Sequence, residues 1–284
     1  MKYTNDPEIL SLYARLNDLL GLSERGEITA TSFLTPRECL YAASFCEARI
    51  REGGAFLWGG FPLSDGDTPP ERRRMLFLPE YAVGFASPDA LAQDPVAALS
   101  STGLDELAGY AADSVRILQI KGSGFRKLSH RDYLGSVLGL GLERSVIGDI
   151  FVADEFSAYL ACKGDLADFL VSNLTNVSAD TVRVSLLPVG FVPPVERKRL
   201  AIRDTVASER LDAVIAAIYN LPRSKAAQLF SDGMVFIGGK MVRSPGQAVA
   251  ENAVVSVRHL GRFVYCGIVK ETRKGRLRVT VKVY

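Results

Sequence analysis

Cysteine, histidine and tryptophan are scarce in this chain, which has four, two and one of them among 284 residues. The cysteines stand at positions 39, 46, 162 and 266, with no Cys-x-x-Cys pair and no histidine at ligand spacing. This excludes the usual zinc sites, which need paired cysteines or histidines a few residues apart. We therefore expect no metal site, and four small buried thiols in a reducing compartment.

Long apolar runs are also absent. No segment approaches the roughly 18 uninterrupted apolar residues that a membrane-spanning helix needs. Asp6, Glu8, Arg15 and Asp18 interrupt the first 20 residues, which excludes a secretory signal peptide. With 48% apolar and 23% charged residues, the composition is that of a folded protein. We expect a cytoplasmic protein with no membrane partner.

What the chain does have is a strong separation of charge. Residues 197–284 contain 17 Lys and Arg against 6 Asp and Glu, a net charge of +11, whereas residues 1–196 contain 17 against 26, a net charge of −9. A basic module joined to an acidic body is typical of a protein that binds a polyanion through one part. The alternative is a basic face that is only solvated.

The N-terminal part shows helical patterns. Apolar residues recur at helical spacing over residues 5–20, and we expect Gly21 to end that helix. A second helix is predicted from Thr35 to Glu52, with Thr35 and Glu38 forming a capping box. Short apolar runs at 56–58 and 75–78 predict some strand, and residues 80–113 predict short helices.

The middle part alternates between strand and helix patterns. It predicts a strand, a helix, two strands, a helix and a strand, at residues 115–120, 129–140, 147–152, 156–161, 166–174 and 181–187. Ser129 is the expected cap of the first of these helices. The β-α-β-β-α-β order is the split βαβ arrangement of ferredoxin-like and RNA-recognition-motif folds. Pro188, Pro193 and Pro194 predict a stiff connector after it.

The basic C-terminal part predicts two helices followed by strands. Ser208 is expected to cap the first helix, and Pro222 to open the second at residues 223–231. A hairpin is predicted at 235–242 and a strand at 254–258. Residues 277–283 alternate apolar and polar side chains, which indicates one buried and one basic face. That strand either follows an RNA backbone or is a charge-protected sheet edge.

Together these patterns predict an α+β protein with three domains. The first, at 1–79, is mostly helical, and the second, at 80–192, resembles an RNA-recognition motif. The third, at 197–284, is the basic module, which includes the C-terminal strand as an extension.

Several segments of the basic module resemble the S4 RNA-binding domain. They are 208–212 (Ser-Glu-Arg-Leu-Asp), 222–229 (Pro-Arg-Ser-Lys-Ala-Ala-Gln-Leu) and 237–240 (Ile-Gly-Gly-Lys), with Gly233, Val235, Val242 and Val249. The pattern departs at Gly238, where Asn is usual, and at Glu251-Asn252, where Gly-Asp is common. S4 domains occur in a small-subunit ribosomal protein, tRNA synthetases, pseudouridine synthases and ribosome-rescue factors, so the resemblance implies RNA as the partner.

A second resemblance reaches further upstream. Residues 125–135 (Phe-Arg-Lys-Leu-Ser-His-Arg-Asp-Tyr-Leu-Gly), 139–141 and 147–150 resemble the YlmH-type S4 proteins. That family joins a helical N-terminal part, a middle domain like an RNA-recognition motif and a C-terminal S4 domain. It is associated with the large ribosomal subunit and with quality control of stalled nascent chains. The resemblance therefore implies large-subunit rRNA, tRNA or both as partners in translation.

Two groups of residues are candidate RNA contacts. Arg223 and Lys225 stand in the first turn of a helix, where their charges and the free backbone N–H groups meet phosphates together. The second group precedes and begins the first helix of the middle domain; the alternative is a solvated loop with His130 helping to cap that helix. The predicted contacts are Arg210, Arg223, Ser224, Lys225, Lys240, Arg243, Arg258 and Arg262, and in the second group Lys121, Arg126, Lys127, His130 and Arg131.

No pattern predicts catalysis or a cofactor. The sequence 210–212 (Arg-Leu-Asp) matches the context of the catalytic Asp in pseudouridine synthases, but 213–215 (Ala-Val-Ile) replaces the usual Thr-Ser-Gly. We expect Asp212 to stabilise the helix start or to pair with a basic neighbour. No Cys or Ser lies in a nucleophile context with either histidine, and the glycines at 122–124 lack the Gly-Lys-Ser/Thr of a phosphate loop.

The patterns thus predict a monomeric, non-enzymatic RNA-binding protein, and the resemblance implies that it acts on the ribosome. Two alternatives stay open. One is an RNA-modifying enzyme whose S4 domain delivers substrate, and the other is a protein adaptor in division or stress.

Overall fold

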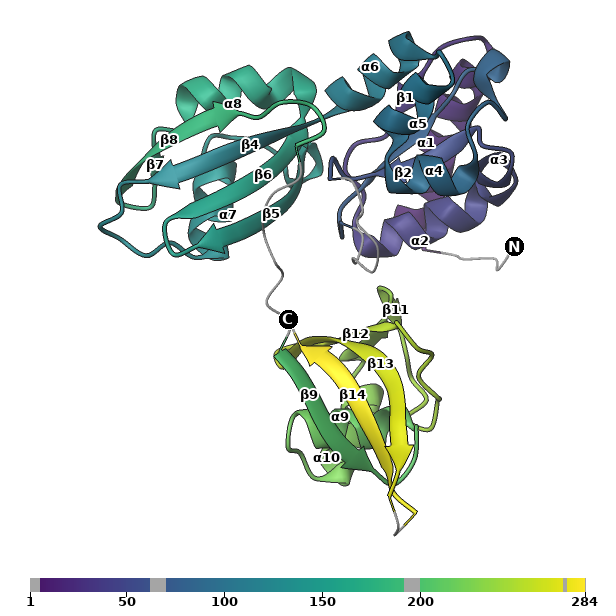
Figure 1. Ribbon diagram of the computed structural model, residues 1–284, viewed down its shortest axis with the longest axis vertical. Coiled ribbons are helices and arrows are strands. Elements are labelled where there is room, and N and C mark those ends of the chain that lie inside the picture. Colours follow the sequence, from purple (N-terminus) through teal and green to yellow (C-terminus); the bar gives the residue numbers. More distant parts are fainter. Residues whose placement is uncertain (1–5, 62–69, 192–199, 273–274, 284) are drawn as a thin grey trace. The chain divides into compact units, whose positions relative to one another are not determined.

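The chain folds into two compact units, Met1–Val195 and Glu196–Tyr284. The computed structural model describes residues 6–61, 70–191, 200–272 and 275–283, and only the backbone of residues 200–204 and 240. Each unit combines helices with antiparallel sheet (Figure 1), which confirms the predicted α+β class. The connector predicted at Pro193 and Pro194 lies outside the described residues.

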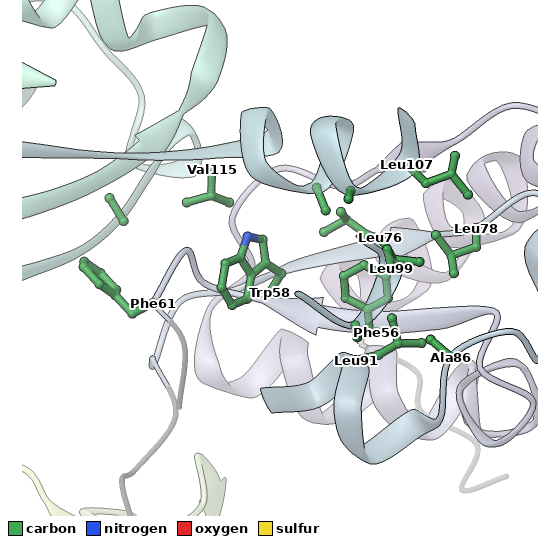
Figure 2. Packing of buried hydrophobic residues seen from close by; sticks show 14 of the residues in the cluster. Phe56, Trp58, Phe61, Leu76, Leu78, Ala86, Leu91, Leu99, Leu107 and Val115 are labelled. Carbon is green, nitrogen blue, oxygen red and sulfur yellow. The ribbon is translucent and has the colours of Figure 1, made fainter. Parts of the chain in front are cut away.

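The first unit begins with three layers around a small sheet of strand order β1-β3-β2. Leu12 and Leu16 of α1 pack with Met75 and Phe77 on one side of β3. On the other side Leu76 packs with α4, α5 and α6, as Figure 2 shows for several of these side chains. The elements are α1 (Pro7–Glu24), β1 (Thr29–Ala30), α2 (Pro36–Phe45), α3 (Glu47–Arg51), β2 (Ala55–Trp58), β3 (Arg74–Phe77), η1 (Glu80–Ala82), α4 (Pro88–Gln93), α5 (Pro95–Ser101) and α6 (Asp105–Ser114).

Two predicted helix boundaries in this part are wrong. The first helix continues through Gly21 to Glu24, because the next turn still buries Ser23. It ends where Gly26 takes a φ of +99°, a conformation that glycine adopts without strain. The second helix is not continuous to Glu52 but breaks at Cys46 into α2 and α3. The capping box of Thr35 and Glu38 at its start is confirmed.

The β-α-β-β-α-β part follows in the same unit, and its predicted order is confirmed. Its sheet has the strand order β5-β6-β4-β8-β7, so β4 lies between β6 and β8 as the split βαβ arrangement requires. Helices α7 and α8 cover one face of this sheet (Figure 1), where Tyr133, Val137 and Leu170 meet its apolar residues. The elements are β4 (Val115–Gly122), α7 (His130–Leu138), η2 (Arg144–Val146), β5 (Ile147–Asp154), β6 (Ser157–Lys163), η3 (Gly164–Leu166), α8 (Ala167–Asn173), β7 (Asn176–Val177) and β8 (Asp180–Leu186).

Two arginines, the buried Arg74 and the partly buried Arg72, join the two parts of the first unit. Arg74 on β3 donates to the carbonyl oxygens of Thr31 and Ser114. Arg72 donates to the carbonyl oxygens of Phe33, Arg144 and Ile147 at 3.1–3.2 Å. Burial lowers the pKa of Arg72 and of Arg74. The bonds to Ser114, Arg144 and Ile147 cross the predicted boundary at residues 79 and 80, and the helical part and the middle part form one compact unit.

The second unit is a six-stranded sheet with two helices on one face. The strand order is β11-β10-β12-β13-β14-β9, and α9 and α10 lie behind the strands in the view of Figure 1. Their core joins Val214, Ile215 and Phe230 to Val255 and Phe263 of the sheet. The elements are β9 (Leu200–Val206), α9 (Leu211–Ile218), α10 (Arg223–Ser231), β10 (Val235–Ile237), β11 (Lys240–Met241), β12 (Val254–Val257), β13 (Gly261–Glu271) and β14 (Leu277–Val283).

Two features of this unit differ from expectation. The residue that caps α9 is Arg210 and not Ser208, and it makes no side-chain cap hydrogen bond. The C-terminal strand β14 lies between β13 and β9, so the interpretation of residues 277–283 as a sheet edge is wrong. Its predicted alternation is confirmed, because Val279 and Val281 are buried in the core.

Candidate nucleic-acid interface

Asp212 joins the starts of the two helices of the second unit. Its buried carboxylate accepts hydrogen bonds from Arg210 at 3.2 and 3.3 Å and from Arg223 at 3.2 and 3.1 Å. Arg210 is the N-cap of α9 and Arg223 is the first residue of α10. The expectation that Asp212 pairs with a basic neighbour is therefore confirmed.

The charge balance around Asp212 leaves positive charge at the surface. Burial by itself raises the pKa of Asp212, but the two guanidinium groups outweigh burial and hold that pKa below its usual value. The carboxylate is thus ionised at neutral pH, and it neutralises one of the two arginines. The side chains of Arg210 and Arg223 are still 49% and 51% exposed, so both keep N–H groups available to a phosphate.

The first turn of α10 adds backbone donors beside these side chains. Ser224 and Lys225 are exposed there, and the first N–H groups of a helix have no acceptor within it. The N–H groups and the helix dipole favour an anion at this point. We call Arg210, Arg223, Ser224 and Lys225 the helix-side patch.

A loop after β11 closes over the start of α9. The N–H of Leu211 donates to the carbonyl of Gln247 at 2.9 Å, and that of Asp212 to the carbonyl of Pro245 at 3.1 Å. Arg243 stands exposed at the beginning of this loop. Lys240 lies in β11, where the structure describes its backbone alone.

Arg258 and Arg262 belong to a different surface of the same unit. Arg262 donates to the hydroxyl of Ser256 at 2.9 Å, and the Arg258 guanidinium lies over the ring of Phe236 at 5.0 Å. Phe236, Ser256 and Arg262 are opposite one another on adjacent strands. The alternate residues, such as Val255 and Phe263, pack under the helices.

Because side chains of a strand alternate between its faces, this second surface is the sheet face opposite α9 and α10. The strand register brings two further cations to this face. Val264, two residues after Arg262 and on the same side of β13, pairs with Lys282, and Arg278 is on the same side of β14 as Lys282. None of the outward positions of β10, β12 and β14 carries a carboxylate. We call Arg258, Arg262, Arg278 and Lys282 the sheet-side patch.

The predicted contacts of the first unit cluster between β4 and α7. Lys121, Arg126, Lys127, His130 and Arg131 are all exposed there. Lys127 is paired with Glu155. The expected cap of α7 is confirmed: Ser129 is its N-cap, and Asp132 completes a capping box by accepting from the N–H and hydroxyl of Ser129 at 2.8 and 2.6 Å.

His130 is a weaker candidate for phosphate than its neighbours. Loss of solvent around the imidazole, and then the charge of Arg144, lower its pKa from the usual 6.5. At neutral pH it is therefore mostly uncharged and offers one N–H donor rather than a positive charge.

Three residues of these surfaces are not among the predicted contacts, although the strand that carries two of them was predicted either to follow an RNA backbone or to be a sheet edge. Arg278 and Lys282 join the sheet-side patch only through the pairing of β13 with β14. Phe125 is an almost fully exposed aromatic residue in the basic loop before α7. The alternating pattern of residues 277–283 indicated that Arg278 and Lys282 are on the exposed face of their strand. By contrast, no sequence pattern predicts that a single aromatic side chain such as that of Phe125 is exposed.

The described residues hold no group of three His, Cys, Asp or Glu side chains placed to bind a metal ion. Among these same residues, no helix is both long and apolar enough to cross a membrane. Both oxygens of Asp212 accept hydrogen bonds from arginines, as in a structural ion pair.

Comparison with known proteins agrees with this domain arrangement. Residues 112–190 match the protein-family model described as "Putative RNA-binding domain in YlmH", and residues 209–255 match the S4 domain. The "Ribosome-associated protein quality control protein P2" of Bacillus subtilis (strain 168) is 30% identical over 263 residues, which cover 91% of this chain and 88% of that protein.

A solved structure is also similar. It is the "Cell division protein ylmH from Streptococcus pneumoniae", 19% identical with a TM-score of 0.44, and the match covers 66% of this chain and 96% of that one. The extent of the Bacillus match, together with both domain matches, decides the family. The chain is a member of the YlmH family of S4-domain proteins.

Proposed function

We propose that this protein is a non-catalytic, monomeric, cytoplasmic RNA-binding protein that acts on the ribosome. It binds large-subunit rRNA, tRNA or both during quality control of stalled nascent chains. The name of the Bacillus relative supports the ribosomal setting, and the net charge of +11 in residues 197–284 supports a polyanionic partner.

The observation that carries the proposal is the helix-side patch. Two guanidinium groups share one buried carboxylate, so both are held in place while their outer N–H groups face solvent. The carboxylate fixes Arg223 in the first turn of α10 and Arg210 at the N-cap of α9, and the backbone N–H groups at the start of α10 bind the same kind of anion. Arginine in a fixed position forms two parallel hydrogen bonds with a phosphate.

The basic loop before α7 is a second contact with the same RNA. Two sites on one chain raise affinity because the second binds at a high effective concentration once the first is bound. This combination suits a large and rigid target such as a ribosomal subunit. Each phosphate contact releases counterions, so binding weakens steeply with salt.

Sedimentation with ribosomal subunits tests the proposal. The tagged protein in cell lysate is centrifuged on sucrose gradients at low and moderate salt, beside the double variant Arg223→Ala, Lys225→Ala. We expect the wild type to co-migrate with large subunits and the double variant to move toward the top of the gradient. Arg51→Ala, which removes an exposed charge on α3, is the matched control and keeps the wild-type position.

Two outcomes would contradict the proposal. If the wild type stays at the top of the gradient at low salt, the ribosome is not its partner. If the double variant co-migrates like the wild type, the helix-side patch is not the anchor. A mass change in RNA incubated with the protein would show an enzyme instead.

A further inference from the structure

Phe125 is the most exposed large apolar side chain among the residues that the structure describes. Its relative exposure is 96%, compared with 60% and 59% for Tyr81 and Phe85, which follow it. A single exposed aromatic residue is common on protein surfaces and by itself implies nothing. The surroundings of Phe125 distinguish it.

The loop that carries Phe125 is held at several points. The N–H of Gly122 donates to the carbonyl of Phe156, and the N–H of Leu128 to that of Glu155, both at 2.8 Å. Asp180, which is buried, accepts from the N–H and the hydroxyl of Ser123. The loop is therefore fixed on both sides of the aromatic residue.

Between these anchors the chain turns outward. Gly124 has a φ of +90°, a conformation that L side chains rarely adopt. The N–H of Phe125 then donates to the Ser123 hydroxyl at 3.3 Å. The backbone thus presents the ring to solvent from a defined position, at low conformational cost on binding.

The side chains around Phe125 are mostly cationic, and these cations lie near carboxylates: Lys121 lowers the pKa of Asp154, and Arg126 and Arg131 lower that of Asp132. Neither a hydrogen bond nor an ion pair joins Lys121, Arg126 or Arg131 to a carboxylate in the part of the chain that the structure describes. The nearby carboxylates serve the protein itself: Asp132 bonds Ser129, Asp154 bonds Phe156 and Ser157, Glu155 pairs with Lys127, and Asp180 holds Ser123.

The sheet of the middle part cannot offer an aromatic platform in its place. In RNA-recognition motifs, aromatic residues on the open sheet face stack on bases. Here Tyr159 of β6 is buried and packs against Phe191, with ring centroids 5.6 Å apart. Ile117 of β4 is buried in the core shared with the N-terminal part. Phe151 of β5 is partly buried and packs against Phe61, with ring centroids 4.6 Å apart. Among the described residues of the middle part, the most exposed aromatic ring is that of Phe125 in the loop.

We propose that Phe125 stacks on an unpaired base of the bound RNA while Lys121, Arg126 and Arg131 contact the neighbouring phosphates. A partner that offers flat aromatic faces along a chain of negative charges matches this arrangement, and single-stranded RNA has that chemistry. The inference rests on the proposed RNA binding and adds that the first unit selects unpaired nucleotides.

Two fluorescein-labelled RNA probes of equal length test this. One is a duplex with an unpaired internal loop, and the other is the matched, fully paired duplex, so the phosphates are the same in number. We expect Phe125→Ala to lower affinity for the looped probe about tenfold, within the roughly 5- to 150-fold range that loss of one stacked base implies. Affinity for the paired probe does not change, and Phe125→Tyr keeps wild-type binding.

Salt dependence separates stacking from charge. Stacking releases no counterions, so Phe125→Ala leaves the slope of log affinity against log salt unchanged. Arg126→Ala lowers affinity for both probes and reduces the slope by about 0.7 to 0.9 for one phosphate contact. Tyr81→Ala and Phe85→Ala are matched controls for loss of an exposed ring, and they bind both probes like the wild type.

A second measurement reports on the ring itself. Trp58 is the single tryptophan of the chain and is buried. Phe125→Trp therefore adds an exposed tryptophan, and its emission is obtained by subtracting the wild-type signal. We expect the looped probe to quench this emission and the paired probe to leave it unchanged.

The outcomes distinguish the inference from the proposed function. If the wild type binds both probes and Phe125→Ala binds the looped probe equally well, the stacking role is wrong while RNA binding stands. The same holds if the looped probe fails to quench Phe125→Trp. A wild type that binds neither probe at low salt would contradict RNA binding and the stacking role together.

Discussion

The Arg223 guanidinium lies 3.1 Å from the Asp212 carboxylate and thereby ties the first residue of α10 to the first turn of α9. Asp212 is buried and Arg223 is half exposed. The pair therefore serves both the stability of the second unit and the placement of a charge at its surface.

Asp212→Asn tests how much this ion pair contributes to the stability of the second unit. The variant keeps the shape of the side chain but leaves two arginines without a charged partner, and we expect the second unit to lose about 1 to 3 kcal/mol of unfolding free energy at neutral pH. Far-UV circular dichroism during urea unfolding measures this. Trp58 fluorescence reports on the first unit alone and should give an unchanged midpoint.

The same variant gives a pH prediction. The pKa of Asp212 is lower in the folded protein than the unfolded value of about 3.9, so its stabilisation is present above that value and is lost as the pH falls through the folded pKa. The stability difference between wild type and Asp212→Asn should thus be constant from neutral pH to about pH 4 and shrink below it. A difference that stays constant in acid would exclude an ionised Asp212 as its source.

The two basic patches of the second unit should act independently because they lie on opposite faces of the sheet. Arg262→Ala with Lys282→Ala removes charge from the sheet-side patch, and we expect weaker RNA binding and a salt slope smaller by up to about 1.8. Combined with Arg223→Ala and Lys225→Ala, the losses in binding free energy should add. Fluorescence anisotropy with labelled rRNA fragments at several salt concentrations measures both the affinity and the salt slope. If the sheet-side variant binds with wild-type affinity, RNA contacts only the helix side of this unit.

Arg74 is expected to hold the first unit together. It is buried, and Arg74→Ala removes the donors to the Thr31 and Ser114 carbonyls, at a cost of about 2 to 3 kcal/mol. Because Trp58 pairs with Arg74 on the neighbouring strand, its fluorescence during urea unfolding follows this loss directly. Arg51→Ala at an exposed site should change the unfolding free energy by no more than about 0.5 kcal/mol. An equal loss of unfolding free energy in both variants would argue against the role of Arg74.

The capping box at the start of α2 allows a smaller test. Thr35→Ala removes the acceptor of the Glu38 N–H, and we expect a loss of about 1 kcal/mol in the first unit. Ser11→Ala in the middle of α1 changes the same kind of hydroxyl at an exposed position and serves as the control. Trp58 fluorescence again measures both, and equal midpoints for the two variants would show that the box contributes nothing.

Local patterns were sufficient for most helices and strands. The capping box of Thr35, the start of α10 after Pro222 and the succession of strands and helices along the middle part all depend on residues a few positions apart, and these interactions form wherever the segment lies. The errors have another source. The continuation of α1 past Gly21 and the break at Cys46 depend on what the flanking turns pack against, which is distant in the sequence.

The second unit shows the same division most clearly. Its basic charge, its helices and the alternation in residues 277–283 follow from composition and spacing, since charge and periodicity belong to the chain itself. Only the pairing of strands shows that β14 is an inner strand, because it lies between β13 and β9. The sheet likewise places Arg258 and Arg262 on the face away from the helices, whereas Arg223 is on the helix side. Strand pairing joins segments that are far apart in the chain, and the two helices cover only one face of the resulting sheet. The division of one basic module into two surfaces was therefore decided by the tertiary structure alone.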